Sequence, residues 1–142
     1  MARTTASTDR EVSDRIVAHA LYTDPPLGRA ALSETEARKT GRPLLIGQRP
    51  MSLVSRAIEK GEKGEKGEKG ETQGFMKVVV DAETTKLLGA AILGIDGDEA
   101  IHGTLDVMCA GGTSTTLQRS VGIHPTVSKL VPTMLGELKP AT

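Results

Sequence analysis

Three histidines and one cysteine are the side chains in this sequence that could carry acid–base, thiol or metal chemistry. His102 and Cys109 are seven residues apart in a run that predicts one helix, so they lie on the same side of it. They would still be about 10 Å apart along the axis, and zinc would need two further ligands. We therefore predict no metal site, and interpret Cys109 as a core thiol and His102 as a surface imidazole. His19, in a strand-like run, is interpreted as structural.

His124 has a different setting, because Pro125 follows it directly and a predicted helix begins just beyond. A side chain held at the edge of a rigid element suits a general base or a contact with a flavin. The alternative is a histidine that belongs only to a helix-capping loop. The sequence has no Gly-x-Gly-x-x-Gly turn for a dinucleotide phosphate and no second cysteine for a dithiol. Neither chemistry is therefore predicted for this chain alone.

The elements that must position these side chains follow from hydrophobic periodicity and turn residues. Apolar runs bounded by Pro or Gly predict strands, and capping signals at Ser33 and Thr115 predict the starts of two short helices. Apolar residues recurring at helical spacing from Val127 predict a final amphipathic helix, kinked at Pro132. The predicted strands are 15–23, 43–49, 52–58, 75–80 and 87–93, and the predicted helices are 34–39, 98–109, a short one opening at 115, and 127–138.

The hairpin of strands 75–80 and 87–93 carries apolar residues at consecutive positions in both strands. Such runs are typical of a sheet that is covered on both faces. Gly89, Ala90 and Ala91 keep the surface of the second strand low, so we expect a helix backbone to approach closely there.

The domain organisation is simple. Residues 1–14 are polar and aperiodic, which predicts a disordered leader or linker remnant, and residues 15–140 predict a single domain. Within the domain, the triplet Glu-Lys-Gly occurs four times in residues 59–71. Four triplets without proline cannot sustain a collagen triple helix, so the segment is interpreted as an exposed, lengthened hairpin loop.

The composition limits the classes of function. The 142 residues contain 18 Lys+Arg and 18 Asp+Glu, with both signs interspersed, so no nucleic-acid or membrane partner is expected. The apolar runs are too short to span a bilayer. The polar start does not resemble a signal peptide and one cysteine cannot form an internal disulfide, so a cytoplasmic location is expected. With one Phe, one Tyr and no Trp, the core must be aliphatic.

Five motifs, taken in order, resemble one known family. They are Tyr22–Arg29 (YTDPPLGR), Leu32–Glu34 (LSE), Gly74–Asp81 (GFMKVVVD), Leu88–Ala90 (LGA) and His124–Thr126 (HPT). Together they closely resemble the C-terminal dimerisation domain of the pyridine nucleotide-disulfide oxidoreductases, which include dihydrolipoyl dehydrogenase and mercuric-reductase-like proteins. The ending looks most like the mercuric-reductase-like branch, although the vicinal cysteine pair of true mercuric reductases is absent. The resemblance implies an α+β fold, an antiparallel sheet flanked by helices, that pairs two subunits.

The resemblance also implies a role for His124 and Pro125. In the family this element crosses the subunit interface and lies beside the flavin, where the imidazole acts in trans as a base toward a redox thiol. Complete family enzymes carry FAD and NAD(P) in upstream domains, so no cofactor is expected on this chain alone. The expected function is an isolated interface domain of an FAD- and NAD(P)H-dependent oxidoreductase, homodimeric and not catalytic alone. The alternative is an interaction module that pairs in trans with a full-length flavoprotein homologue.

Lys129 departs from the family pattern, which has a Glu paired with the histidine at this position. With Thr126 as N-cap, residue 129 would be the third helical residue, where Glu completes a capping box. Lysine there should cost about 1 kcal/mol of helix stability. An ammonium also disfavours a protonated imidazole beside it, so we predict a weakened base function for His124.

Overall fold

The computed structural model describes residues 11–55, 57–58 and 72–142. Most of the predicted leader and the whole Glu-Lys-Gly segment, 59–71, lie outside the described residues. Of the leader, Val12–Asp14 forms a single 3-10 turn, η1.

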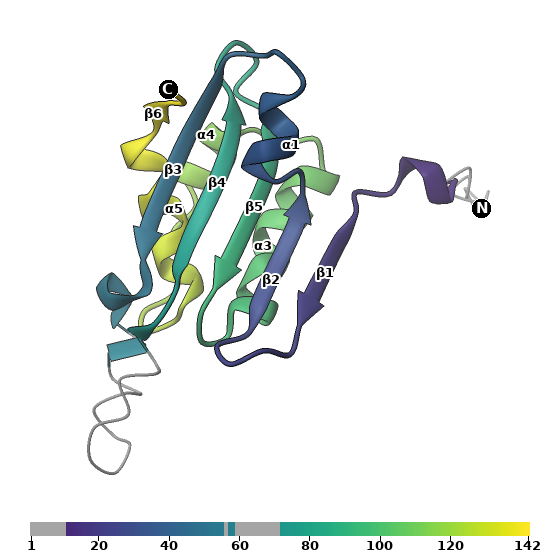
Figure 1. Cartoon of the computed structure of the whole chain (residues 1–142). Helices are drawn as coiled ribbons and strands as arrows, with labels where there is room; N and C mark the ends of the chain where they lie inside the picture. The colour runs from purple at the N-terminus through teal and green to yellow at the C-terminus, as the bar shows by residue number, and fades with distance from the viewer. Residues whose placement is uncertain (1–10, 56, 59–71) are drawn as a thin grey trace, which may run out of the picture.

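One antiparallel sheet organises the chain, with the strand order β1-β2-β5-β4-β3-β6 (Figure 1). Its strands are β1 (Ala18–Leu21), β2 (Leu27–Ala31), β3 (Leu44–Pro50), β4 (Phe75–Asp81), β5 (Leu87–Leu93) and β6 (Lys139–Pro140). Every pair of neighbouring strands is antiparallel. The hairpins β1–β2, β3–β4 and β4–β5 join neighbours in sequence, and β2–β5 brings the first part of the chain against the second.

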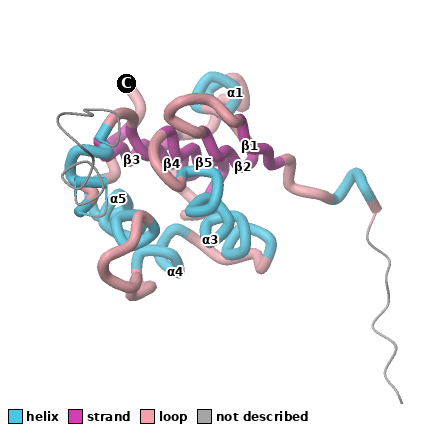
Figure 2. The backbone as a smooth tube through the Cα atoms, turned by 90° about the horizontal axis from the view of Figure 1, so that it is seen from below, coloured by secondary structure: helices cyan, strands magenta, loops and turns pink. Residues whose placement is uncertain are grey.

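Helices cover the two faces of this sheet unequally. Figure 2 shows the sheet edge-on, with the short α1 on one face and α3, α4 and α5 on the other. The helices are α1 (Glu34–Arg38), α3 (Gly97–Cys109), α4 (Ser114–Gln118) and α5 (Val131–Met134), with 3-10 turns η2 (Met51–Leu53), η4 (Ser128–Leu130) and η5 (Leu135–Glu137). The predicted class, an α+β domain with an antiparallel sheet flanked by helices, is confirmed.

The core is aliphatic, as the composition requires. Its largest cluster lies between the sheet and α3 to α5, and its bulkiest fully buried side chains are Met51, Met76, Ile92 and Met134. A second, small cluster of Ala37, Leu44 and Val79 lies on the α1 side. Unbranched methionines adapt to irregular spaces, so they fill the volume that aromatic rings fill in other domains.

Two expectations about strands are wrong. The segment 52–58 is helical rather than a strand, with η2 followed by helical residues 55, 57 and 58. Met51, Val54 and Ala57 are all buried, and a spacing of three is a helical period. The strand β2 was not predicted, because its glycine and the two preceding prolines indicate a turn. The predicted strand 15–23 is present in the shorter form β1.

The final helix is also not as predicted. Residues 128–137 form η4, α5 and η5 in succession, and the chain then ends in the edge strand β6. Pro132 lies in the first turn of α5, where a missing N–H costs nothing. The apolar stripe is correct, since Val127, Val131, Met134 and Leu135 are buried. Interactions with the sheet therefore hold a segment that is too irregular to be one helix.

Helix starts differ from the predicted ones by a few residues. The capping box at Ser33 and Glu36 is confirmed, with Glu36 N–H donating to Ser33 Oγ at 3.2 Å. The N-cap of α3 is Asp96 rather than residue 98, and α4 begins after Thr113 rather than at 115. Thr126 does not cap a helix, so the stability cost assigned to Lys129 on that basis is wrong.

Small residues permit two close approaches to the sheet. A Cβ at Gly28 would lie 2.2 Å from the carbonyl oxygen of Gly97, at the start of α3. A Cβ at Gly89 would lie 1.8 Å from the carbonyl oxygen of Leu32, just before α1. A close approach at Gly89 was predicted, but the approaching backbone is the extended segment leading into α1 rather than a helix. The helix backbone approaches at Gly28.

Candidate functional site around His124

His124 lies in the loop that connects α4 to η4, and both His124 and Pro125 are exposed. The peptide bond between them is cis. Thr126 Oγ1 donates a hydrogen bond of 2.6 Å to the carbonyl oxygen of Ile123, which closes the loop around the His-Pro pair. The predicted placement of His124 at the edge of an ordered element is therefore correct.

Gly122 brings this loop against the turn that follows it. A Cβ at position 122 would lie 2.6 Å from Lys129 Cα, closer than real side chains approach. The absence of a side chain at Gly122 therefore lets the loop fold back onto η4. In this arrangement Lys129 Nζ lies 3.2 Å from His124 Nδ1. Lys129 thus contacts the imidazole of His124 directly.

A hollow of about 220 Å³ opens beside the pair. Its lining residues are Val54, Ser55, His124, Thr126, Lys129, Leu130 and Thr133. They come from the segment after β3, from the His124 loop, and from η4 and α5. The described lining contains an ammonium, an imidazole and hydroxyl groups but no carboxylate. Such a set offers hydrogen-bond donors, which suits a negatively charged group.

The His124 loop also carries two exposed apolar side chains. Val121 is 95% exposed and Ile123 is 78% exposed, whereas Val127, at the far end of the loop, is 3% exposed. The loop is thus anchored in the core at one end and presents apolar surface at its tip. These two side chains are among the most exposed large apolar residues that the structure describes.

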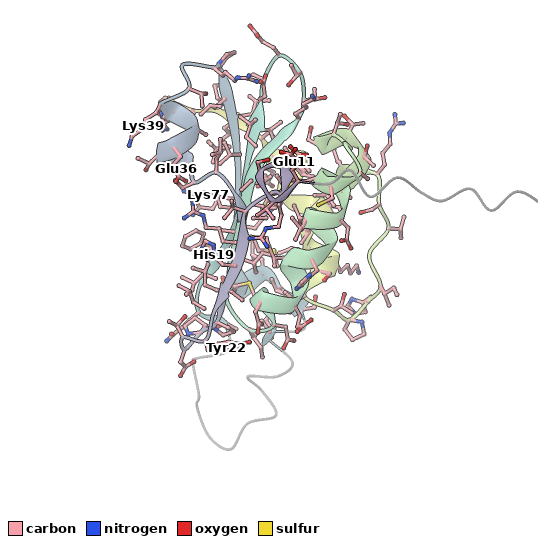
Figure 3. All side chains as sticks on the ribbon, turned by 90° about the vertical axis from the view of Figure 1, so that its right-hand side faces the viewer. Glu11, His19, Tyr22, Glu36, Lys39 and Lys77 are labelled. Carbon is pink, nitrogen blue, oxygen red and sulfur yellow. The ribbon has the colours of Figure 1, made fainter. Side chains whose placement is uncertain are left out.

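The other two histidines and the cysteine line a second hollow, between β1 and α3. His19 on β1 and His102 and Cys109 on α3 line one hollow of about 320 Å³. Figure 3 shows His19 on β1 and Tyr22 at the end of that strand. Cys109 is exposed, so its interpretation as a core thiol is wrong, whereas His102 is exposed as predicted. Within residues 11–55, 57–58 and 72–142, no three or more His, Cys, Asp or Glu are placed to hold a metal ion.

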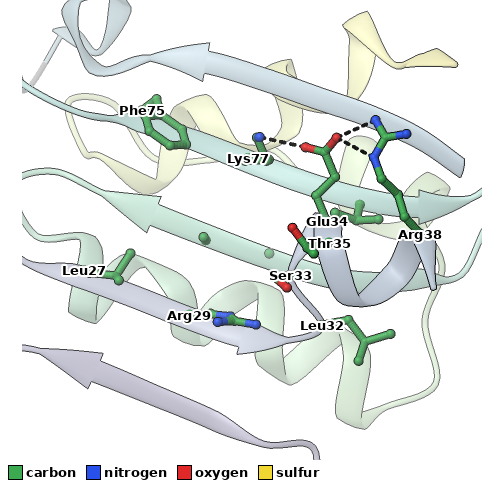
Figure 4. A pocket seen from close by; sticks show the side chains of 12 residues that line it. Leu27, Arg29, Leu32, Ser33, Glu34, Thr35, Arg38, Phe75 and Lys77 are labelled. Carbon is green, nitrogen blue, oxygen red and sulfur yellow. Dashed lines mark hydrogen bonds and ion pairs between the residues drawn. The ribbon is translucent and has the colours of Figure 1, made fainter. Parts of the chain in front are cut away.

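A network of ion pairs surrounds α1 on the opposite face of the sheet (Figure 4). Glu34 accepts hydrogen bonds from Lys77 Nζ at 2.8 Å and from Arg38 Nη2 at 2.6 Å. These bonds lower the pKa of Glu34, with the Lys77 contact as the largest cause. Glu36 pairs with Arg29, and the Ser33 hydroxyl and amide are the main causes that lower its pKa to about 2. From the sequence we predicted only the capping box; Arg29 and Lys77 lie on the strands β2 and β4, and the local pair of Glu34 with Arg38 was missed.

Asp81 is the buried carboxylate of the sheet, with a side chain 2% exposed. Its oxygens accept the N–H groups of Glu83 at 2.9 Å and Thr84 at 3.0 Å, and Arg42 Nη1 at 2.8 Å. The Thr84 amide is the largest cause that lowers the pKa of Asp81 to about 2. The sequence indicated a turn here but not this ion pair, which connects residues far apart in the chain.

The residues present do not fit a dinucleotide cofactor. A dinucleotide site lies at the ends of parallel strands, where a Gly-rich turn leads into a helix. All strand pairs of the described sheet are antiparallel. In the part of the chain that the structure describes, FAD or NAD(P) therefore has no such turn to bind. No helix among these residues has the length and apolar character needed to cross a bilayer.

A family model and individual relatives both match this chain, and they indicate the same family. Residues 17–135 match the family model described as "Pyridine nucleotide-disulphide oxidoreductase, dimerisation domain". The chain is 30% identical over 121 residues to the "Probable pyridine nucleotide-disulfide oxidoreductase RclA" of Escherichia coli (strain K12), covering 84% of this chain and 25% of that protein. It is 34% identical over 109 residues to the dihydrolipoyl dehydrogenase of Thermus scotoductus, covering 77% of this chain and 22% of that protein.

A solved structure shows the same similarity in three dimensions. The "HOCl-induced flavoprotein disulfide reductase RclA from Escherichia coli" aligns with a TM-score of 0.79 and 28% sequence identity. The alignment covers 89% of this chain and 27% of that one. The chain thus spans about a quarter of the length of the relatives it matches.

Proposed function

Since the chain belongs to the family of pyridine nucleotide-disulfide oxidoreductase dimerisation domains, we propose that it forms a homodimer and that the His124 loop contacts the partner subunit. Association of subunits is the role of this domain in the family. The observation that carries the proposal for this chain is the loop itself. Its tip exposes Val121 and Ile123 beside His124, while its base is fixed in the core by Val127.

The amount of exposed apolar surface supports a contact at this position. Burying an aliphatic side chain is worth about 1.5–3 kcal/mol, so Val121 and Ile123 from two subunits would contribute substantially to a symmetric interface. His124 lies directly beside them, which would place the imidazole at the boundary between the subunits.

The redox chemistry of the relatives is proposed to belong to the parts of those proteins that this chain does not match. The E. coli structure is described as a flavoprotein disulfide reductase, and this chain covers only 27% of it. The antiparallel sheet described above does not fit a dinucleotide. The contribution of this domain to such an enzyme would therefore be its interface and His124, offered in trans to the partner's active site.

The oligomeric state of the 142-residue chain tests the proposal. Sedimentation velocity at micromolar concentration should show a dimer. The double variant Val121→Ser/Ile123→Ser should shift the species toward monomer, whereas Val12→Ser, which changes a similarly exposed side chain far from His124 in the sequence, should not. A wild-type monomer would overturn the homodimer, and a dimer insensitive to the double variant would overturn the role of the loop.

The alternative is a complex with a full-length flavoprotein homologue. Mixing the chain with the E. coli relative and separating the species by size would test it. Co-elution of the chain with flavin absorbance, together with a monomeric chain on its own, would replace the homodimer by this complex. Separate elution would leave the homodimer as the proposed state.

A further inference from the structure

The contact between Lys129 and His124 determines which ring nitrogen carries the proton. Lys129 Nζ lies 3.2 Å from His124 Nδ1. An ammonium has three donors and no acceptor, so Nδ1 must be the acceptor in this hydrogen bond. A neutral imidazole has one N–H and one bare nitrogen. The proton of the neutral ring therefore lies on Nε2.

We propose that Lys129 is a positioning residue that holds His124 in the Nε2–H tautomer, so that the loop presents a hydrogen-bond donor and not a base. A ring that acts as a base must accept a proton on its outward nitrogen. With Nδ1 engaged by Lys129, that nitrogen is Nε2 and already carries its hydrogen. A carboxylate at position 129 would have the opposite effect, because it accepts from Nδ1–H and leaves Nε2 bare.

The surroundings of the pair support this assignment. The other polar residues that line the described hollow are Ser55, Thr126 and Thr133. Thr126 donates its hydroxyl hydrogen to Ile123, so it is not a free donor. No carboxylate lines the described hollow, so none competes there with His124 for the ammonium. Gly122 holds the loop close enough for the contact to form.

The tautomer defines the kind of group that the loop would recognise. Nε2–H and the remaining N–H groups of Lys129 are donors, and they suit a thiolate better than a thiol. A thiolate would accept the hydrogen bond from Nε2–H without transfer of a proton. Only this choice of ligand rests on the proposed function, since it assumes the redox thiol of a partner's disulfide-type site. The tautomer itself is a property of the chain.

Long-range ¹H–¹⁵N NMR of the imidazole rings tests the proposal directly on the 142-residue chain. The spectra are recorded at a pH of about 8.5, which favours the neutral form of imidazole in general. Nδ1 and Nε2 differ in their coupling to the ring hydrogens, so each signal can be assigned, and loss of one set in His124→Gln identifies the residue. We expect His124 Nε2 at the shift of a protonated nitrogen and Nδ1 at that of a bare nitrogen.

Variants at position 129 show whether Lys129 sets the tautomer of His124 or whether the ring adopts that tautomer without it. Lys129→Glu should exchange the two shifts, and Lys129→Arg should preserve them, because a guanidinium also only donates. Lys129→Met should move both shifts toward the average of a free ring. Lys86→Glu, a charge reversal in the β4–β5 turn, is the matched control and should change neither. The rings of His19 and His102 are internal references.

Two results would overturn the proposal. One is a wild-type His124 with its proton on Nδ1, and the other is a His124 whose shifts are the same in wild type, Lys129→Glu and Lys129→Met. The backbone amide spectrum of each variant shows whether it is folded. These results are independent of oligomeric state: a monomer with Nε2–H would contradict only the proposed homodimer, and a dimer with Nδ1–H would contradict only the tautomer.

Discussion

The α1 face of the sheet and the His124 loop use charge in opposite ways. Around α1, cations meet carboxylates: Lys77 and Arg38 both contact Glu34, and Arg29 contacts Glu36. In the loop, Lys129 contacts the imidazole of His124 and not a carboxylate. Around α1 each of these cations is paired with a carboxylate of the same chain. In the loop, by contrast, the N–H groups of Lys129 that do not contact His124 remain available as donors. A difference of this kind separates charges that hold a fold together from charges available to a partner.

The two regions also use glycine differently. Gly89 is buried in β5 and admits the backbone of Leu32, on which the position of α1 depends. Gly122 is part of an exposed loop and admits the backbone of Lys129. Both glycines permit a close approach, but only the first lies within the sheet. Substitutions at the two positions should therefore separate stability from the geometry of the candidate site.

Gly89→Ala should have the largest effect. Its Cβ would overlap the Leu32 carbonyl, and because the obstacle is backbone, the cost should reach the upper end of overpacking, about 3 kcal/mol. Chemical denaturation followed by circular dichroism measures the loss. Gly103→Ala is the matched control: that glycine lies in α3 with nothing within 4 Å of its Cβ, so the change should stabilise by about 0.5–1 kcal/mol. If Gly89→Ala and Gly103→Ala were equally stable, the close approach of the Leu32 carbonyl to Gly89 would be contradicted.

Asp81→Asn should have the next largest effect, and its effect should depend on pH. The folded-state pKa of Asp81 is about 2, below the ordinary 3.8, so its carboxylate stabilises the fold above about pH 4 and this contribution is lost as pH falls toward 2. An asparagine cannot pair ionically with Arg42. The unfolding free energy of the variant should be lower than that of the wild type at pH 7, and this difference should become smaller at pH 5 and smaller again at pH 3. Asp106→Asn, on the exposed side of α3, is the control. If the loss of unfolding free energy in Asp81→Asn became larger as pH fell, the lowered pKa of Asp81 would be contradicted.

Ser33→Ala should cost about 1 kcal/mol, the usual value of a helix cap. The change removes the hydroxyl that accepts from Glu36 N–H and one of the groups that lower the pKa of Glu36. Thermal unfolding at neutral pH measures the loss of stability in Ser33→Ala. Thr113→Ala removes the corresponding side chain at α4 and is a useful parallel, since a similar loss would show that both caps contribute. No loss in either variant would mean that packing alone fixes these short helices.

Gly122→Ala should have the smallest effect on stability, well below that of Gly89→Ala, because we expect the exposed segment of Lys129 that the new Cβ would overlap to move aside. It should nevertheless separate His124 from Lys129, since the new Cβ would lie 2.6 Å from Lys129 Cα. The imidazole ¹⁵N shifts should then resemble those of Lys129→Met. Unchanged shifts would show that the contact between His124 and Lys129 does not depend on the close approach at Gly122.

The parts of the fold that could be predicted are those in which local sequence and final environment agree. Strands β4 and β5 are nearly as predicted, since apolar runs bounded by Gly74 and Gly94 specify them locally. Strand β2 was missed because Gly28 is there for a tertiary reason, the approach of Gly97, that no local pattern reveals. In 52–58 the burial period of three was present in the sequence, at Met51, Val54 and Ala57, but the β-branched residues obscured it.

The candidate site was predictable to a similar extent. The position of His124 and the importance of Lys129 followed from short-range motifs. Ser55 and Thr133, which line the same hollow, come from segments that only the packed structure brings together. The role of Gly122 depends on a backbone approach of the same kind. The sequence therefore indicated the candidate residue His124, while the fold determined its hydrogen-bond partner and the residues that line the hollow beside it.

The backbone hydrogen bond from Met51 N–H to the Gly74 carbonyl, 3.0 Å long, follows the last pair of the β3–β4 hairpin, Pro50 with Phe75. The register pairs that the structure describes for this hairpin all lie on the sheet side of that bond. We therefore expect insertions or deletions between positions 58 and 72 to leave these pairs in place. We expect this position to tolerate an inserted epitope or fluorophore tag, which would make it a convenient place to label the domain for association measurements.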